Sequence, residues 1–201
     1  MKNISTDPKE ELKGKRVRVE DPFAPTTIGR YRLTKLLGKG SFGSVYLATN
    51  DEGKVVALKE IRSEDDPKNL LRIQTEVNIL KAVKHPNVIE LYDVIQDSSQ
   101  RIFLATEYCS GGDLSQYLKR KKTLNELEVQ KVVHHVAEGL KALYKLNIMH
   151  RDIKLQNLLI SCNGNKTIVK IADFGLAKYL TGYASTYCGT LYYMAPEIIQ
   201  G

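Results

Sequence analysis

The chain has 201 residues, 42% hydrophobic and 26% charged, which excludes a wholly disordered, collagen-like or coiled-coil protein. Lys and Arg number 30 against 23 Asp and Glu, and the net charge of +7 favours binding of anions without choosing among nucleotides, acidic proteins, nucleic acid and membranes. Three widely spaced cysteines exclude a disulfide scaffold or a CxxC zinc module. With no secretory signal and no transmembrane segment recognisable, the sequence predicts a soluble protein of a reducing compartment, the cytoplasm.

The first part of the chain divides into a polar tail and a β-rich segment. Residues 1–27 mix both charges and contain three prolines, which predicts a tail. Within 28–107, three runs (31–37, 44–48 and 55–59) alternate with glycine-rich turns and predict an antiparallel meander. One amphipathic helix is expected after Pro67, and its apolar face consists of Leu70, Ile73, Val77 and Leu80.

Residues 108–201 are predominantly helical. A short helix is predicted over 113–122, and a longer one begins near Asn125, which forms a capping-box pattern with Glu128. Its apolar stripe comprises Val129, Val132, Val133, Val136, Leu140 and Leu143. Two short strands, 157–161 and 167–172, follow with an Asn-Gly turn between them. The prediction is an α+β protein with a tail (1–27), a small β-rich lobe (28–107), and a hinge with a helical lobe (108–201).

A glycine-rich loop lies between the first two predicted strands. It has the pattern G-x-G-x-x-G-x-V, which includes Gly38, Lys39, Gly40, Ser41, Phe42, Gly43 and Val45. A strand follows the loop, whereas a dinucleotide-binding loop would precede a helix. Glycines at the tip of a hairpin let the backbone approach phosphates closely. A flexible hairpin without a ligand is the alternative.

Two charged residues are candidates for an internal ion pair. Lys59 ends the strand 55–59, and Glu76 lies beside the apolar seam of the helix rather than opposite to it. A pair between them would aim the ammonium group at phosphate oxygens. The alternative is a surface pair of Arg72 with Glu76, which would contribute only ~0.3–0.5 kcal/mol.

Polar residues gather at the ends of the later strands. The run 150–157 has the sequence HRDIKLQN, and Asp173-Phe174-Gly175 follows the second strand. The oxygen-bearing side chains of Asp152, Asn157 and Asp173 suit Mg²⁺ that is also held by substrate phosphates. Each of them alone could be a turn residue.

From Tyr31 onward the ordered motifs resemble those of eukaryotic protein kinases of the Ser/Thr type. The resemblance implies ATP and Mg²⁺ as cofactors and Ser/Thr-containing proteins as substrates. It implies that Lys59 binds the α- and β-phosphates and pairs with Glu76, and that the glycine loop covers the phosphates. Asp152 would orient the substrate hydroxyl or accept its proton, and Lys154 would neutralise the γ-phosphate. Asn157 and Asp173 would hold Mg²⁺.

The same resemblance implies a nucleotide pocket and a stacked spine. Thr106 corresponds to the gatekeeper, the backbones of Glu107 and Cys109 would contact adenine, and Asp113 would contact ribose. The adenine ring would lie between Val45, Ala57 and Leu159. The regulatory spine would comprise Leu80, Leu91, His150 and Phe174, which ordinary core packing would also explain.

The activation segment, 173–197, carries the implied regulation. Lys154 matches the Ser/Thr class, and Thr190 is expected to bond near Asp152 and Lys154. Thr186 is the candidate phosphosite for an upstream kinase, with Arg151 and Lys178 receiving its charge. The alternative is that the hydroxyls there are only exposed loop residues. Among Ser/Thr kinases, the chain resembles the autophagy-initiating ones, with calmodulin-dependent kinases close behind.

Two alternatives to an active kinase follow from the sequence. The sequence ends four residues after Glu197, where kinases continue through further helices, so the 201 residues alone are expected to have little activity and low stability. They would then act as a nucleotide-binding or interaction module. The basic run 119–122 could be a nucleic-acid or membrane patch, but no aromatic residues interleave it, and no nucleic-acid partner is expected.

Overall fold

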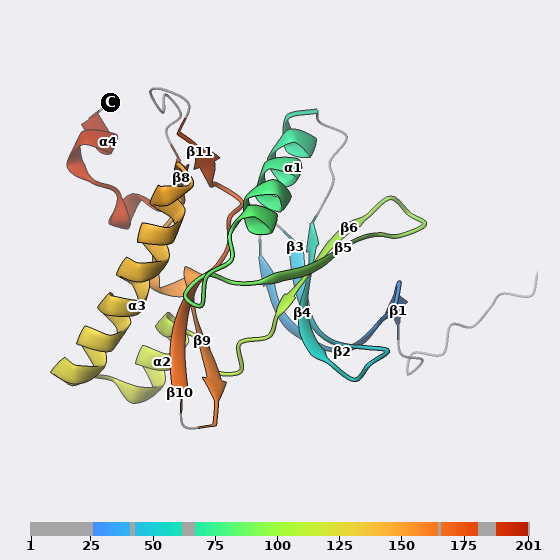
Figure 1. The fold of residues 1–201 in the computed structure, drawn as a ribbon, viewed down its shortest axis with the longest axis horizontal. Helices are drawn as coiled ribbons and strands as arrows, with labels where there is room; N and C mark the ends of the chain where they lie inside the picture. Colours follow the sequence, from blue (N-terminus) through green and yellow to red (C-terminus); the bar gives the residue numbers. More distant parts are fainter. Residues whose placement is uncertain (1–25, 41–42, 62–66, 165, 181–187, 201) are drawn as a thin grey trace, which may run out of the picture.

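The computed structural model describes residues 26–40, 43–61, 67–164, 166–180 and 188–200. They form two lobes, one built on a large sheet and the other containing α2 and α3 (Figure 1). The predicted α+β, two-lobed architecture is confirmed. The predicted residue boundaries of tail, small lobe and large lobe stay predictions.

The sheet of the small lobe has the order β1-β2-β3-β4-β6-β5, and all neighbouring strands are antiparallel. Its strands within the described residues are β1 (Thr27–Ile28), β2 (Tyr31–Gly40), β3 (Gly43–Asn50), β4 (Val55–Ile61), β5 (Leu91–Gln96) and β6 (Ile102–Glu107). The three predicted runs lie in β2, β3 and β4, so the meander is confirmed. Pairing of β2 with β3 continues to Gly40 and Gly43, which brings the glycine loop to the tip of a hairpin.

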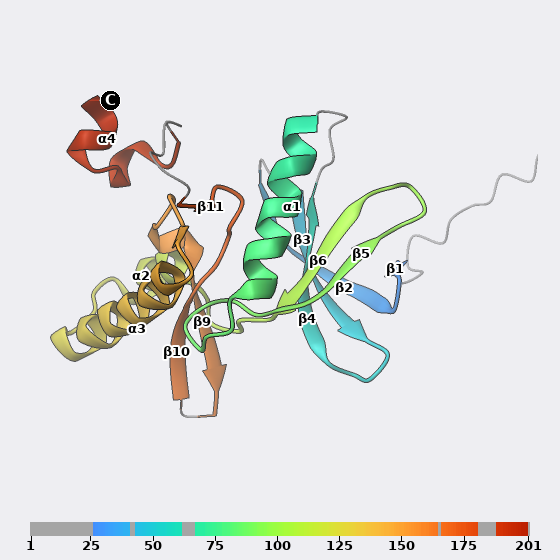
Figure 2. The same ribbon diagram turned by 45° about the horizontal axis from the view of Figure 1, so that its top comes forward.

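One helix, α1 (Pro67–Ala82), lies against this sheet (Figure 2). Ile73, Ile79 and Leu80 are buried, in agreement with the predicted face at Ile73 and Leu80. The prediction was wrong for Leu70, which is 58% exposed, so the buried stripe begins one turn later. Glu76 is buried within this stripe at 6% exposure, as the pairing hypothesis required.

The large lobe combines two helices with short strands. They are β7 (Gly112–Asp113), α2 (Leu114–Lys121), α3 (Glu126–Lys145), β8 (Ile148–Met149), η1 (Leu155–Asn157), β9 (Leu158–Asn163), β10 (Lys166–Ile171) and β11 (Lys178–Tyr179). The order β10-β9-β7 forms one small antiparallel sheet, and β11 pairs with β8. The chain ends with η2 (Leu191–Tyr193) and α4 (Pro196–Gln200). No helix of the described residues is long and apolar enough to cross a membrane.

The long helix α3 begins with the predicted capping box. The Asn125 side chain accepts the Glu128 amide hydrogen and the Glu128 carboxylate accepts the Asn125 amide hydrogen, each at 3.0 Å. Leu143 is fully buried in the main core, while Val133 on the same predicted stripe is 59% exposed. The helix therefore uses only part of its apolar surface against the described residues.

The connection between α1 and β5 ties the lobes together. The amide of Ile89 donates to the carbonyl of Ile171, and the amide of Ile171 donates to the carbonyl of Asn87, both at 2.9 Å. The buried side chain of Asn87 donates to the carbonyl of Val169 at 2.9 Å. One hydrophobic cluster also includes residues of both lobes, so strands and loops that bear the functional side chains share a core.

Candidate active site

The glycine loop requires glycine at position 43, where β3 begins. Gly43 has φ +137°, and a Cβ there would lie 1.8 Å from the carbonyl oxygen of Glu60 on the neighbouring strand. Any other residue would have to displace this backbone. Gly38, Lys39 and Gly40 lie on β2 opposite Val45, Ser44 and Gly43. Ser41 and Phe42 lie outside the described residues.

An ion-pair triad joins the two lobes. Lys59 Nζ lies 2.8 Å from Glu76 Oε1 and 2.9 Å from Asp173 Oδ1. Lys59 comes from β4, Glu76 from α1 and Asp173 from the segment after β10, so three distant elements meet at one ammonium group. The alternative surface position of Glu76 is excluded by its burial.

The triad fixes the charge of its members. Burial alone would lower the pKa of Lys59, but Glu76 and Asp173 outweigh burial and raise that pKa above its ordinary value. Burial alone would raise the pKa of Asp173, but the Lys59 ammonium outweighs burial and lowers it. At neutral pH the site thus holds a charged lysine and an ionised aspartate.

A stacked set of side chains supports the triad. The rings of His150 and Phe174 meet edge to face, with centroids 4.9 Å apart. Leu80, Leu91 and Phe174 are buried members of the main core. His150 Nε2 donates to the carbonyl of Ala172 at 3.0 Å, and burial lowers its pKa, so the ring is neutral. The main core therefore contains side chains both of α1 and of the segment that carries Asp173.

A second polar network surrounds Asp152. Thr190 Oγ1 donates to Asp152 Oδ1 at 2.6 Å, and Lys154 Nζ lies 2.7 Å from Asp152 Oδ2. Lys154 Nζ also donates to Thr190 Oγ1 at 2.9 Å, which closes the network that the sequence predicted. Although burial alone would raise the pKa of Asp152, the hydrogen bonds from Lys154 and Thr190 lower it. The carboxylate is therefore ionised and held in one orientation.

The buried amide of Asn157 is oriented for a cation. Its Nδ2 donates to the backbone carbonyl of Asp152 at 2.8 Å and to Asp152 Oδ2 at 3.0 Å. Both donor hydrogens are thus used, and no described residue donates to the amide oxygen. With Asp173 this provides hard oxygen ligands of the kind Mg²⁺ takes. The described residues contain no group of three or more His, Cys, Asp or Glu side chains that could hold a metal, so the set fits Mg²⁺ only with ligand phosphates completing it.

Residues 31–201 match the profile of the protein kinase domain. The chain belongs to this family. The kinase is 42% identical over 182 residues to serine/threonine-protein kinase ATG1c of Arabidopsis thaliana, covering 89% of this chain and 25% of that protein. It is 38% identical to serine/threonine-protein kinase ULK1 of Homo sapiens over 186 residues (87% and 18%) and 38% identical to NUAK family SNF1-like kinase 2 of Rattus norvegicus over 176 residues (86% and 27%). The chain thus spans about a quarter or less of these relatives.

The hinge of this kinase presents a free backbone donor. Within the described residues the amide of Cys109 makes no hydrogen bond, and its side chain is buried, which raises the pKa of the thiol to about 12. Ala57 pairs with the gatekeeper Thr106 across β4 and β6. Leu159 on β9 pairs with Asp113 on β7, whose Oδ1 caps α2. The predicted adenine and ribose residues therefore lie along connected strands between the lobes.

One residue at the hinge was missed by the sequence reasoning. Lys170 Nζ lies 2.7 Å from Glu107 Oε1, and both side chains are largely buried. This carboxylate oxygen also accepts the amide of Glu90 at 3.2 Å. The signal in the sequence is a single lysine inside the apolar run of β10, Ile168-Val169-Lys170-Ile171. A charge in such a run indicates a buried partner.

Five described residues other than glycine have a positive φ, and two of them lie at the candidate site. Arg151 and Asp173 have φ of +67° and +62°, which is uncommon for residues other than glycine and is concentrated at functional sites. Arg151 Nε donates to the carbonyl of Leu176 at 2.7 Å, while its buried Nη1 has no hydrogen-bond partner in the described part of the chain. Thr186 lies outside the described residues.

Proposed function

We propose that this kinase domain transfers the γ-phosphoryl group of ATP, with Mg²⁺, to Ser or Thr hydroxyl groups of protein substrates. The arrangement of Asp152, Lys154 and Thr190 supports the proposal most strongly. It presents an ionised carboxylate beside an ammonium group and a hydroxyl donor. The Lys59 triad supplies a second cation, in position for the non-transferred phosphates.

Each group has a separate task. Asp152 orients the substrate hydroxyl and accepts its proton as the oxygen bonds to phosphorus. Lys154 offsets the charge of the transferring group, and Lys59 holds the α- and β-phosphates. Asn157 and Asp173 would hold Mg²⁺, which when bound neutralises phosphate charge. Positioning and fixed charge thus account for the role of every polar group in the site.

Nucleotide recognition is assigned to the surrounding backbone and apolar side chains. The cover over the phosphates would comprise Gly38, Lys39, Gly40, Ser41, Phe42 and Gly43. Val45, Ala57 and Leu159 would enclose the adenine, and the backbones of Glu107 and Cys109 would bond its edge. The unpaired amide of Cys109 supports this assignment. Asp113 would contact the ribose through the carboxylate oxygen that does not cap α2.

Asp152→Asn and Lys59→Met test the function. Each removes a charge that acts on the reacting groups, so we expect the rate of phosphotransfer to fall about 10²–10⁴-fold. Each variant should still unfold cooperatively when it is heated without MgATP. Asp51→Asn and Lys35→Met, at exposed positions of the small lobe, are matched controls and should keep activity. Near-normal turnover of Asp152→Asn contradicts the proposal. Binding of MgATP without turnover by the unaltered protein would favour a nucleotide-binding module.

Phosphorylation of Thr186 by an upstream kinase is proposed as the control of this site. The unpaired buried nitrogen of Arg151 supports it, because a phosphate there would supply the missing acceptors. After treatment with the upstream kinase, Thr186→Ala should be no more active than the unphosphorylated protein. Ser185→Ala should be as active as the phosphorylated unaltered protein. Arg151→Ala should remove the difference between the two forms. Equal activity of both forms of the unaltered protein would contradict the switch.

The remaining assignments concern organisation and location. We propose the division into a tail (1–27), a small lobe (28–107), and a hinge with a large lobe (108–201), and limited proteolysis with mass determination would test it by cleavage near residue 27 first. A cytoplasmic location is proposed because Cys109, Cys162 and Cys188 are all free thiols, as a reducing compartment permits. Imaging of a fluorescent fusion tests it, and a secreted fusion would contradict it.

A further inference from the structure

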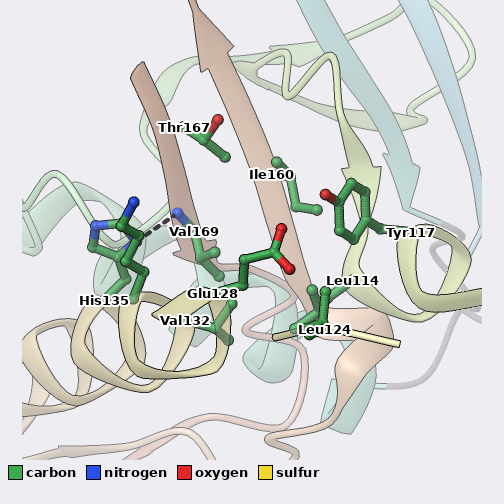
Figure 3. A pocket seen from close by; sticks show the side chains of 10 residues that line it. Leu114, Tyr117, Leu124, Glu128, Val132, His135, Ile160, Thr167 and Val169 are labelled. Atoms are coloured by element: carbon green, nitrogen blue, oxygen red, sulfur yellow. Dashed lines mark hydrogen bonds between the residues drawn. The ribbon is translucent and has the colours of Figure 1, made fainter. Parts of the chain in front are cut away.

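A cavity lies in the large lobe between α2, α3 and the β9–β10 hairpin (Figure 3). Its volume is about 180 Å³. An engineered apolar cavity of about 150 Å³ accepts benzene, so this one has room for a leucine-sized side chain. The floor is apolar, because Leu114, Ile160 and Val169 belong to the buried core.

The cavity lies on the opposite face of β9 from the proposed adenine site. Ile160 lines the cavity, and its neighbour Leu159 is assigned to the adenine. Successive side chains of a strand point to opposite faces, so a ligand here would not occupy the nucleotide site. Thr167 on β10 is exposed at the rim. The polar edge and the apolar floor together resemble a pocket for an anchoring side chain.

The surroundings of the cavity carry excess positive charge. Lys131 lines it and is exposed, with no hydrogen bond or ion pair to a described residue. Lys121 is paired with Glu128, the acidic member among the described lining residues, so that carboxylate is already neutralised. Lys166, beside Thr167, is exposed and likewise unpaired among the described residues. Of these two, Lys131 lines the cavity, and Lys166 lies outside it but near enough to lower the pKa of His135 in its wall.

His135 adds a polar contact to the cavity, and its pKa responds to the positive charges nearby. Its Nδ1 accepts the amide of Val169 at 3.3 Å, which leaves Nε2 as the donor of a neutral ring. Partial burial lowers the pKa of His135. The positive charges of Lys166 and Lys131, together with His134, lower this pKa further. A carboxylate near this rim would be attracted by the groups that disfavour a charged His135.

We propose that this cavity is a docking site for an acidic peptide segment of a protein partner, in which one aliphatic side chain fills the cavity between flanking carboxylates. The aliphatic anchor matches the apolar floor and the volume. The carboxylates match the ammonium group of Lys131 at the cavity and the positive charge of Lys166 nearby. Docking here places a bound protein against the large lobe, on the face of β9 away from the proposed adenine site, so it would recruit a substrate or regulator independently of ATP. The recruiting role rests on the proposed kinase function, whereas peptide binding does not.

Fluorescence anisotropy with the full protein tests the site. The probe is a fluorescein-labelled peptide with one leucine between pairs of glutamates and without Ser, Thr or Tyr, so it cannot be a phosphoacceptor. We expect saturable binding with a Kd of roughly 10–300 μM, unchanged by MgATP and weakened by salt. Replacement of the leucine by serine, or of the glutamates by lysines, should weaken binding at least tenfold. Equal binding of the serine or the lysine peptide overturns the proposal, as does no saturation below ~1 mM.

Two variants separate the cavity from nonspecific charge. Thr167→Phe fills the rim and should weaken binding at least tenfold, and the double variant Lys131→Glu/Lys166→Glu should do the same and remove the salt dependence. The double variant Lys35→Glu/Lys81→Glu, at exposed positions of β2 and α1 in the other lobe, changes the charge equally and should bind as the unaltered protein does. If Thr167→Phe unfolds, the lysine variants decide. Unchanged binding in the double variant, or self-association that Thr167→Phe abolishes, overturns the proposal, the latter in favour of a second copy as occupant.

Discussion

A single buried ion pair connects the two lobes of the kinase domain at the hinge. Glu107 accepts from Lys170 Nζ at 2.7 Å, and the pair is largely buried. Removal of one member of such a pair leaves an uncompensated charge, which costs about 3–5 kcal/mol. Lys170→Met should therefore lower the free energy of unfolding, measured by urea denaturation, by about that amount. It should also weaken nucleotide binding, because the proposed adenine contacts lie at the hinge.

Lys166→Met is the matched control for this prediction. It removes a lysine from the same strand, but at an exposed position, so its effect should stay within about 0.5 kcal/mol. The double variant Lys170→Met/Glu107→Gln removes the stranded charge and should recover part of the loss. If Lys170→Met and Lys166→Met have the same free energy of unfolding, the buried pair does not stabilise the hinge.

The charge of Asp173 gives a prediction about pH. Its folded-state pKa is lowered, so its ionised form adds stability above the unfolded pKa of about 3.8, and this stability disappears as pH falls through the lower folded value. The difference in unfolding free energy between the unaltered protein and Asp173→Asn should be constant from pH 5 to 9 and shrink below pH 4. Urea denaturation at each pH measures it. A difference that changes between pH 6 and 8 would contradict an ionised Asp173 in the triad.

At the scale of elements, the capping box of α3 can be tested separately from the core. Asn125→Ala removes the acceptor of the Glu128 amide and should lower the unfolding free energy by about 1 kcal/mol. Lys131→Ala, on the exposed side of the same helix, should change it by less than half of that. Urea denaturation of the three proteins measures both. Equal stability of Asn125→Ala and the unaltered protein would show that the tertiary contacts of α3 suffice.

The same elements show what the sequence could predict. The alternation in β2, β3 and β4, the Asn125 cap and the ordered catalytic motifs are local patterns, and the structure agrees with the patterns in its strands and cap. The sequence could not predict that Leu70 and Val133 are exposed, because the burial of a helical residue depends on which distant part of the chain packs against it. The Lys170 pair joins residues 63 positions apart, and the cavity joins α2, α3 and β10, so neither has a short-range pattern.

At the scale of the whole molecule, the lobes are coupled through shared contacts. Three kinds of contact cross between them: the Lys59–Asp173 pair, the backbone bonds of Ile171 with Ile89 and Asn87, and a hydrophobic cluster that includes Leu104 and Phe174. A ligand that also bridges the lobes stabilises only the joined state. Nucleotide binding should therefore stabilise the molecule as a unit rather than one lobe.

This coupling predicts the thermal response to MgATP. At a concentration about 100 times its Kd, a ligand specific to the folded state adds ~2.7 kcal/mol, which for a chain of this size raises the Tm by roughly 5–10 °C. Calorimetry should show one transition that moves as a whole. Lys59→Met and Asp173→Asn each remove a proposed phosphate or Mg²⁺ contact and should lose most of the shift, while Asp51→Asn should keep it. ATP with EDTA should give a smaller shift than MgATP because phosphate charge is then uncompensated. Two transitions, of which only one responds to nucleotide, would show that the contacts between the lobes are too weak to couple them.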